Sequence, residues 1–404
     1  MKIAYITAKA PYGKGEAFII EEMLMVSELG EDLLIIPRNP PLELFHKKGR
    51  QLINRIIWLP LFDKRFIIYF LKKLLSNLQL WRVIGDIFRY SRNPKILLKN
   101  VAILPKAVFL TKVMREKKIE HIHAHWGSTT ATIAYVISKL KGIPWSFTLH
   151  RWDIREDNML KEKVKSAKFC RIISEHGKNE LLGVIGRDFE KKIEVINMGI
   201  EVPGEILELQ KNKDFFTIIT PANFVEKKGH KYLTEACEIL INRGFRYFQC
   251  VFYGEGPLRR EIESIIRGKD LTEYIKLPGA IPHEKLLHMY KNREVDIVVL
   301  PSINTSSGEC EGIPVALMEA MAYSIPVIST NTGGIPELIG DGSGIMIEEK
   351  DSLALADAIE RLIEDEAFRE ELGRKGRLKV MEDFYLDYIA KDLIKLFEEE
   401  NSEL

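Results

Sequence analysis

The sequence is poor in cysteine and has no long uncharged hydrophobic run. Its 404 residues include four cysteines, and none of them forms a C-x-x-C pair. This excludes a disulfide framework and a cysteine zinc site, and it indicates a reducing compartment. The most apolar stretch, 66–84, is interrupted by Lys72, Lys73 and Arg82, so it falls short of the roughly 20 apolar residues that span a bilayer. Because the N-terminus also lacks an apolar signal region, we expect a cytoplasmic protein without a transmembrane helix.

The chain also lacks net charge, with 59 Lys and Arg residues against 58 Asp and Glu residues. Residues 1–200, however, hold 35 basic and 20 acidic side chains, whereas residues 201–404 hold 24 and 38. The basic excess lies in 46–118, where 18 Lys and Arg residues face only three acidic ones. The overall balance argues against a nucleic-acid partner. The local surplus indicates an anionic partner for this segment alone.

Length and periodicity predict two α/β domains. A chain of this length exceeds the size at which one core keeps growing, and short β-rich runs alternate with helical periods, as in parallel βαβ units. The expected strands are 2–7, 33–36, 121–123, 145–149, 171–174, 216–220, 249–253, 275–277, 297–300, 326–329 and 344–347. A polar linker over 199–214 should separate Rossmann-like domains at 1–200 and 201–382. An acidic helical segment, 383–404, should cross back to the first domain.

Within the basic insertion at 46–118, apolar residues recur at helical spacing. They are Ile67, Phe70, Leu71, Leu74, Leu75, Leu78, Trp81, Ile84 and Phe88. The pattern predicts a basic amphipathic helix. It either contacts an anionic membrane surface or a lipid-diphosphate acceptor, or it packs its apolar stripe on the core of its own domain.

The segment 311–322, EGIPVALMEAMA, places Glu311 and Glu319 around a predicted helix start. Pro314 suits the first helical position, so Glu311 should lie in the loop before the helix. The free N–H groups of the first turn and the positive end of the helix dipole form an anion site that a nucleotide diphosphate would fill. The two carboxylates then suit acceptance of hydrogen bonds from sugar and ribose hydroxyls. The alternative is an ordinary solvated helix.

Together with its continuation, 322–337, this segment resembles the E-x7-E region of retaining glycosyltransferases of family 4. That family has the GT-B fold, two Rossmann-like parallel-sheet domains facing across a cleft. The version in this chain, with Gly312, Ile313 and Val315 around the proline, is most similar to the branch that builds exopolysaccharides such as colanic acid and amylovoran. The resemblance implies that Glu311 contacts the donor sugar and Glu319 the ribose.

The segment 222–229, ANFVEKKG, is similar to the family loop that clamps the donor diphosphate. Lys228 and Gly229 keep their places, whereas Asn223 stands where the family has an arginine. Because asparagine carries no charge, neutralisation of the diphosphate should depend more on Lys228 and the helix N-terminus. Lys228 could otherwise be an ordinary exposed loop lysine.

Two further loops extend the resemblance. Gly254 and Gly256 lie in a turn similar to the family's glycine turn beside the nucleotide, although an ordinary strand-to-helix turn has the same sequence pattern. Gly279 ends the segment Leu-Pro-Gly, which resembles the loop that meets the base through backbone atoms.

The first half supplies histidines. His121, His123 and His125 alternate along one strand without an evident carboxylate partner, so we expect no metal site and structural roles for the first two. His125 lies at the end of the strand, where ligands bind open α/β sheets, and should face the acceptor side of the cleft. His150 ends 146–150, SFTLH, which resembles the family's F-T-x-H segment and implies a place in the donor-sugar pocket.

Gly13, Lys14 and Gly15 form a glycine loop after the first strand, where the family brings the acceptor close to the donor. The dinucleotide-binding pattern lacks its third glycine here, which argues against an NAD site. The chain contains no Asp-x-Asp motif, with which glycosyltransferases of the other main fold hold a divalent metal. We therefore expect metal-independent transfer and no cofactor.

The sequence thus predicts a retaining hexosyltransferase of polysaccharide biosynthesis, cytoplasmic or peripheral on the inner membrane face. Its donor would be a nucleotide sugar, with a UDP-hexose favoured, and its acceptor a glycan or a lipid-linked glycan. His150, Glu311 and Lys228 are the expected catalytic residues. Two alternatives stay open: a UDP-sugar 2-epimerase of the same fold, which would need no acceptor, and a silent glycan-binding subunit, suggested by Asn223.

Overall fold

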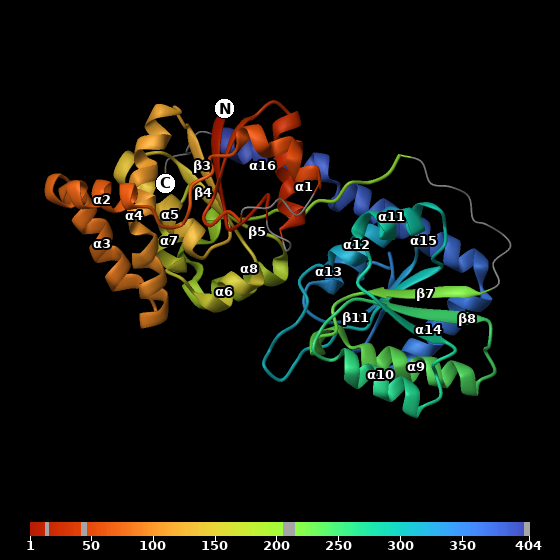
Figure 1. Cartoon of the computed structure of the whole chain (residues 1–404). Helices are drawn as coiled ribbons and strands as arrows, with labels where there is room; N and C mark the ends of the chain where they lie inside the picture. The colour runs from red at the N-terminus through yellow and green to blue at the C-terminus, as the bar shows by residue number, and fades with distance from the viewer. Residues whose placement is uncertain (13–15, 42–46, 205–214, 400–404) are drawn as a thin grey trace. The chain divides into compact units, whose positions relative to one another are not determined.

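A computed structural model shows two compact units, each built on a six-stranded parallel sheet (Figure 1). The structure describes residues 1–12, 16–41, 47–204 and 215–399. The first unit comprises Met1–Gly199 and the chain from Leu386 onward, and the second unit is Ile200–Tyr385. Two Rossmann-like parallel-sheet units agree with the expected α/β class.

The first sheet has the order β2-β1-β3-β4-β5-β6, with all neighbouring strands parallel. Its strands are β1 (Lys2–Thr7), β2 (Asp32–Pro37), β3 (His121–His125), β4 (Trp145–Leu149), β5 (Phe169–Ile172) and β6 (Ile193–Val195). The direction of strand succession reverses between β1 and β3. The loops after these two strands therefore diverge, which is where open α/β sheets bind ligands.

Alternate residues of the first sheet face two separate cores. Ile3 and Tyr5 of β1 belong to one apolar cluster, and Ala4 and Ile6 belong to the other. The unit's α-helices are α1 (Ala17–Glu28), α2 (Lys64–Ser76), α3 (Leu78–Tyr90), α4 (Pro94–Glu116), α5 (Thr129–Lys141), α6 (Arg151–Glu156), α7 (Leu160–Ser166), α8 (Glu175–Ile185) and α16 (Leu386–Glu398). Two 3-10 helices, η1 (Lys47–Arg55) and η2 (Arg187–Lys192), complete it.

The last helix, α16, belongs to the first unit although the second unit precedes it in the chain. It begins at Leu386, three residues later than the segment expected from sequence, because α15 continues to Asp383. The Phe397 ring lies 4.9 Å from the ring of His121 and 5.3 Å from that of His123, centroid to centroid. Helix α16 thereby packs, together with α1, on one face of the first sheet.

The second sheet has the order β12-β11-β10-β7-β8-β9 and is also parallel throughout. Its strands are β7 (Phe216–Pro221), β8 (Phe248–Tyr253), β9 (Ile275–Gly279), β10 (Ile297–Leu300), β11 (Val327–Thr330) and β12 (Ile345–Ile347). Its helices are η3 (Glu226–Lys228), α9 (His230–Asn242), α10 (Arg259–Gly268), α11 (His283–Lys291), α12 (Val315–Ala322), α13 (Ile335–Ile339), α14 (Ser352–Glu364) and α15 (Glu366–Asp383). This is the strand order of a doubly wound nucleotide-binding sheet, and its reversal lies between β7 and β10.

The basic insertion differs from expectation, because it contains no single amphipathic helix over the apolar stripe. Asn77 separates α2 from α3: its Oδ1 accepts hydrogen bonds from the backbone N–H groups of Gln79 at 2.9 Å and Leu80 at 3.3 Å. Asparagine is a strong N-cap, so it ends one helix and starts the next. No helix among the described residues is long and apolar enough to cross a bilayer.

Candidate active site

In the second unit, the strand reversal brings together three charged side chains. Lys227 and Lys228 follow β7, and Glu311 follows β10. The Lys228 Nζ lies 3.0 Å from Glu311 Oε2, and the Lys227 Nζ lies 3.3 Å from Oε1 of the same carboxylate. Glu311 is buried, and the lysines are partly exposed. Two cations against one anion leave a positive surplus where a nucleotide-binding sheet meets its ligand.

Two glycines allow the loops to approach this closely. Gly229 has φ +65°, and a Cβ built on it would lie 1.8 Å from the Pro301 carbonyl oxygen. Gly333 has φ +58°, and its Cβ would lie 2.0 Å from the carbonyl oxygen of Glu311. A side chain at either position would push the loop after β7 or the turn before α13 away from Glu311.

Helix α12 starts one residue later than expected. Pro314 has ψ 116° and lies at the N-cap, so Val315 is the first helical residue. The Leu317 N–H donates to the Pro314 carbonyl at 3.0 Å. Gly312 and Ile313 are half-buried in the loop before the cap. As expected from sequence, Glu311 precedes a helix N-terminus.

Glu319 lies in the second turn of α12 and pairs with His283, which was not among the expected site residues. The His283 Nε2, at the start of α11, lies 2.7 Å from Glu319 Oε1. The carboxylate is 16% exposed and the imidazole 51% exposed. The pair therefore lies at the surface of the second unit, where a ligand hydroxyl could replace the histidine as the carboxylate's partner.

Gly254, Gly256 and Gly279, the other glycines expected at the nucleotide, lie at the carboxyl ends of two neighbouring strands, β8 and β9. The Gly254 N–H, after β8, donates to the carbonyl of Gly279, at the end of β9, at 3.0 Å. A Cβ on Gly254 would lie 2.1 Å from the Ala222 carbonyl oxygen, and one on Gly256 would lie 2.5 Å from that of Phe224. Asn223, between these two residues, is exposed. The three loops singled out from sequence therefore meet at one edge.

In the first unit, four histidines gather on β3 and at the end of β4. We call His121, His123, His125 and His150 the histidine cluster. The hydroxyl of Ser146 lies 2.7 Å from His121 Nε2 and 2.8 Å from His123 Nδ1, and Thr148 Oγ1 lies 2.9 Å from His123 Nε2. The first two histidines are thus hydrogen-bonded within the sheet, away from the strand end.

The other two histidines contact each other at the carboxyl edge. His125 Nε2 lies 2.8 Å from His150 Nε2. Burial lowers the pKa of His150 to about 3 and holds the pKa of His125 well below its usual value, so both rings are neutral near pH 7. The His150 ring also packs against the Trp126 ring, with centroids 4.5 Å apart and the ring planes tilted by 36°.

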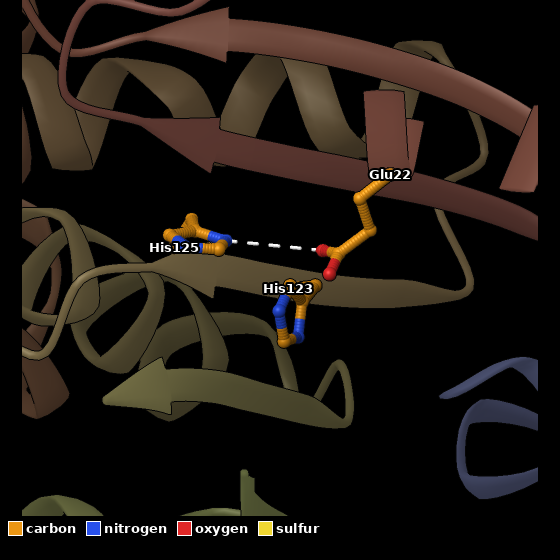
Figure 2. A group of neighbouring side chains, drawn as sticks. All are labelled: Glu22, His123 and His125. Atoms are coloured by element: carbon orange, nitrogen blue, oxygen red, sulfur yellow. Dashed lines mark ion pairs between the residues drawn. The ribbon is translucent and has the colours of Figure 1, made fainter. Parts of the chain in front are cut away.

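A carboxylate does lie beside these histidines, contrary to expectation. Figure 2 shows Glu22 of α1 pointing at His125, with Oε1 3.9 Å from Nδ1 and both side chains fully buried. Glu22, His123 and His125 offer ligand atoms close enough for a metal ion. Two observations argue against that use: His123 has hydrogen-bond partners on both nitrogens, and Glu22 Oε2 is paired with Arg171.

The charge of the nearby carboxylate favours one arrangement of the protons on the two edge histidines. Glu22 Oε1 can only accept, so a proton on His125 Nδ1 is favoured over a lone pair facing the carboxylate. The Nε2 of His125 then accepts from Nε2–H of His150. Nδ1 of His150 is left as an acceptor, suited to a hydroxyl donor.

Glu16 holds the two loops of the first sheet reversal together. Its Oε1 accepts from the Trp126 indole N–H at 2.6 Å, and its Oε2 accepts from the backbone N–H groups of Lys9 at 2.8 Å and Ala10 at 2.5 Å. The neighbouring residues Gly13, Lys14 and Gly15, expected on the acceptor side, lie outside the described residues.

Comparison with known proteins decides the family. Residues 205–379 match the family model described as glycosyl transferases group 1. The amylovoran biosynthesis glycosyltransferase AmsK of Erwinia amylovora is 32% identical over 308 residues, covering 73% of this chain and 74% of AmsK. This chain belongs to the group 1 glycosyltransferases. The colanic acid biosynthesis protein WcaL of Escherichia coli, named as a putative glycosyltransferase, is 38% identical over 187 residues, covering 45% of this chain and 44% of WcaL.

Solved structures agree on the fold of this glycosyltransferase. A Rickettsia africae glycosyltransferase superposes with a TM-score of 0.69 at 19% identity, covering 98% of this chain and 97% of that one. Anabaena HepE, solved in complex with UDP, also superposes with a TM-score of 0.69, at 15% identity and covering 98% of this chain and 99% of HepE. The expected GT-B fold is confirmed.

Three residues of this glycosyltransferase's candidate site escaped the sequence reading. Lys227 adjoins the lysine that was singled out, so the double lysine was the available signal. Nothing in the sequence indicated Glu22 or His283, because their partners, His125 and Glu319, lie in distant segments of the chain.

Proposed function

We propose that this glycosyltransferase transfers a hexose from a nucleotide sugar to a hydroxyl of a glycan or lipid-linked acceptor in exopolysaccharide biosynthesis. The names of AmsK and WcaL support the exopolysaccharide role. The HepE complexes with UDP and with UDP-glucose favour a UDP-hexose donor. The observation that carries the proposal is the surplus of positive charge around Glu311 at the strand reversal of the second unit.

In this proposal, the second unit holds the donor. Lys228, Lys227 and the N–H groups at the start of α12 neutralise the diphosphate, which compensates for the uncharged Asn223. Glu311 orients the sugar and Glu319 binds the ribose, after His283 gives up its place. Gly254, Gly256 and Gly279 let backbone atoms approach the nucleotide.

The reaction that we propose retains the anomeric configuration, as in family 4. The bond between the anomeric carbon and the diphosphate oxygen breaks, and its electron pair goes to the diphosphate. The acceptor oxygen attacks the same face, and its proton passes to the departing phosphate oxygen. Stabilisation of that charge by fixed positive groups is the largest expected contribution. His150 accepts a hydrogen bond from a sugar hydroxyl through Nδ1.

We propose that no metal ion takes part. The positive groups that a metal would supply to the diphosphate are present as Lys227, Lys228 and the helix N-terminus. The enzyme would act in the cytoplasm, where its four free, buried cysteines remain reduced. Full loss of activity with a chelator, restored by manganese, would contradict this step.

A thermal-shift screen of nucleotides and nucleotide sugars tests the proposal first. A ligand at 100 times its Kd stabilises the folded state by about 2.7 kcal/mol, so the donor should stand out before the acceptor is known. The donor found is then incubated with extracted lipid-linked oligosaccharides, and transfer is followed by mass spectrometry. Incubation without acceptor is the control.

Each outcome separates the candidates. Sugar transfer with an unchanged anomeric configuration supports the proposal. A new sugar nucleotide formed without acceptor identifies an epimerase. Nucleotide binding without turnover on any acceptor identifies a silent binding subunit.

A further inference from the structure

The outer sides of α2 and α3 expose apolar side chains that the core does not use. Both helices are fixed from their inner sides, where Phe66, Leu80, Val83 and Ile87 are buried. The exposed residues are Ile67, Ile68, Leu71, Leu75, Leu78, Trp81 and Phe88. We call this set the α2–α3 apolar face. Monomeric proteins rarely leave such a patch uncovered without a binding role.

These residues form one surface across the break between the helices. Ile67, Leu71 and Leu75 follow one another at four-residue spacing on α2, so they share one side of that helix. Leu75 and Leu78, on either side of the break, are 92% and 85% exposed. The Trp81 indole N–H donates to the carbonyl of Leu74 at 2.9 Å, which holds this α3 side chain against the end of α2. Figure 1 shows both helices (orange) at the periphery of the first unit.

The charges beside the face are positive. Lys64, Lys72, Arg82 and Arg89 are exposed among the apolar residues. Both acidic residues of α2, α3 and their caps have partners: Asp63 pairs with Arg65, and Asp86 accepts from the Tyr135 hydroxyl at 2.8 Å. Part of the basic excess of the insertion is therefore displayed beside this face.

We propose that the α2–α3 apolar face docks on an anionic lipid bilayer, lying in its surface. Apolar side chains would enter the boundary between headgroups and acyl chains, and the lysines and arginines would contact anionic headgroups. A second copy of the chain is a poor occupant, because it would bring an equally basic surface against this one. This docking would place the proposed activity beside a lipid-linked acceptor, but the binding itself does not rest on the proposed function.

Co-sedimentation with vesicles tests the docking without any sugar or nucleotide. The full chain should bind vesicles of phosphatidylcholine and phosphatidylglycerol, bind pure phosphatidylcholine more than tenfold more weakly, and lose affinity as salt rises. The variant Leu75→Ser/Leu78→Ser should lose at least tenfold in affinity. The variant Lys72→Ala/Arg82→Ala should lose about 25-fold, since each basic residue near the surface contributes about fivefold.

A control variant changes two exposed leucines of the second unit. Leu353→Ser/Leu378→Ser should bind as the unmodified chain does, since both residues are exposed but lie on the acidic unit. All variants are compared by circular dichroism, so that a folding defect is not read as lost binding. If the serine variant folds poorly, insertion is measured on the unmodified chain instead. Quenching of Trp81 fluorescence by brominated lipids then reports insertion, and the variant Trp81→Phe gives the background from the other tryptophans.

Three results would overturn the proposal. One is absence of binding to anionic vesicles at low salt, and another is binding that all variants retain. The third is self-association in sedimentation velocity that Leu75→Ser/Leu78→Ser abolishes while vesicles are ignored, because the face would then be an interface between copies. None of these results bears on sugar transfer, which is measured separately.

Discussion

The two units share a parallel six-stranded architecture but equip their strand reversals with opposite chemistry. At the second reversal, two partly exposed lysines contact one buried carboxylate, which leaves a positive surplus. At the first, buried neutral imidazoles and two buried carboxylates form hydrogen bonds within the protein. The same topology thus presents charged side chains at one edge and buried, hydrogen-bonded side chains at the other. The comparison can be tested by disturbing each edge separately.

As the pH falls, we expect the first unit to unfold at a higher pH than the second. Burial lowers the pKa of His121 and of His150 to about 3 and holds the pKa values of His123 and His125 well below the usual value, whereas in the second unit burial lowers the pKa of His230 to about 4. In the unfolded chain these histidines are protonated near pH 6.5, whereas in the folded chain they stay neutral to a much lower pH. Their contribution to the free energy of unfolding is therefore present above pH 6.5 and is lost as the pH falls toward the pKa values of the folded state. At pH 5 each such histidine costs on the order of 2 kcal/mol.

One group opposes this loss. Burial raises the pKa of Asp153 to about 7, so its protonation favours the folded state below that pH and offsets about one histidine. All five tryptophans lie in the first 200 residues, so fluorescence reports the first unit and circular dichroism reports both. We expect the fluorescence transition at a higher pH than the main loss of helix. Coincident transitions would mean that the units do not differ in this way.

Removing Lys228, one of the two lysines at the second reversal, should have the largest effect on catalysis. Lys228→Ala leaves the departing diphosphate with one lysine fewer, and we expect kcat to fall about 100- to 1,000-fold. The matched variant Lys231→Ala, which removes a lysine paired with Glu235 on α9, should retain activity. Equal rates for the two variants would show that Lys228 is not part of the active site.

Changes at the first edge should lower kcat less than changes at the second. His125→Gln disturbs the hydrogen bond that orients His150, so we expect kcat to fall about tenfold with little change in KM for the donor. His121→Gln is the control, because that ring is equally buried on β3 but contacts Ser146 instead. If both variants lose activity alike, the role of His125 is structural and not positioning.

The smallest effect should come from adding charge to the second edge. Asn223→Arg restores a cation in the loop after β7, and we expect the nucleotide sugar to bind about fivefold tighter, with a steeper dependence on salt. Asn223→Gln, which adds length without charge, should leave the Kd unchanged. Weaker binding by the arginine variant would show that this loop does not face the diphosphate.

Most of the sheet framework could be predicted from the sequence, because buried parallel strands are short apolar runs. Eleven of the twelve strands were expected near their observed places, with β5 starting at Phe169 instead of 171. The omitted strand, β6, has only three residues and carries a glutamate between its two apolar ones. Its place depends on pairing with β5, which local pattern does not encode.

The candidate site could be predicted only where its residues are neighbours in the chain. The motifs around Glu311, Lys228 and Gly254 were each visible, but the contact of Lys227 with Glu311 depends on how two loops pack. The approach of Glu22 to His125 also depends on tertiary structure. The break at Asn77 was different, since an asparagine inside a helical pattern is itself an N-cap signal.

The position of α16 also bears on the order in which the chain can fold during synthesis. The first unit needs Phe397 over His121 and His123, but the ribosome makes all of Ile200–Tyr385 before that helix exists. At about 5–20 residues per second, the nascent first unit waits tens of seconds with the part of its sheet beneath α16 still uncovered. The second unit, being continuous, can fold as soon as it emerges, although it is made later.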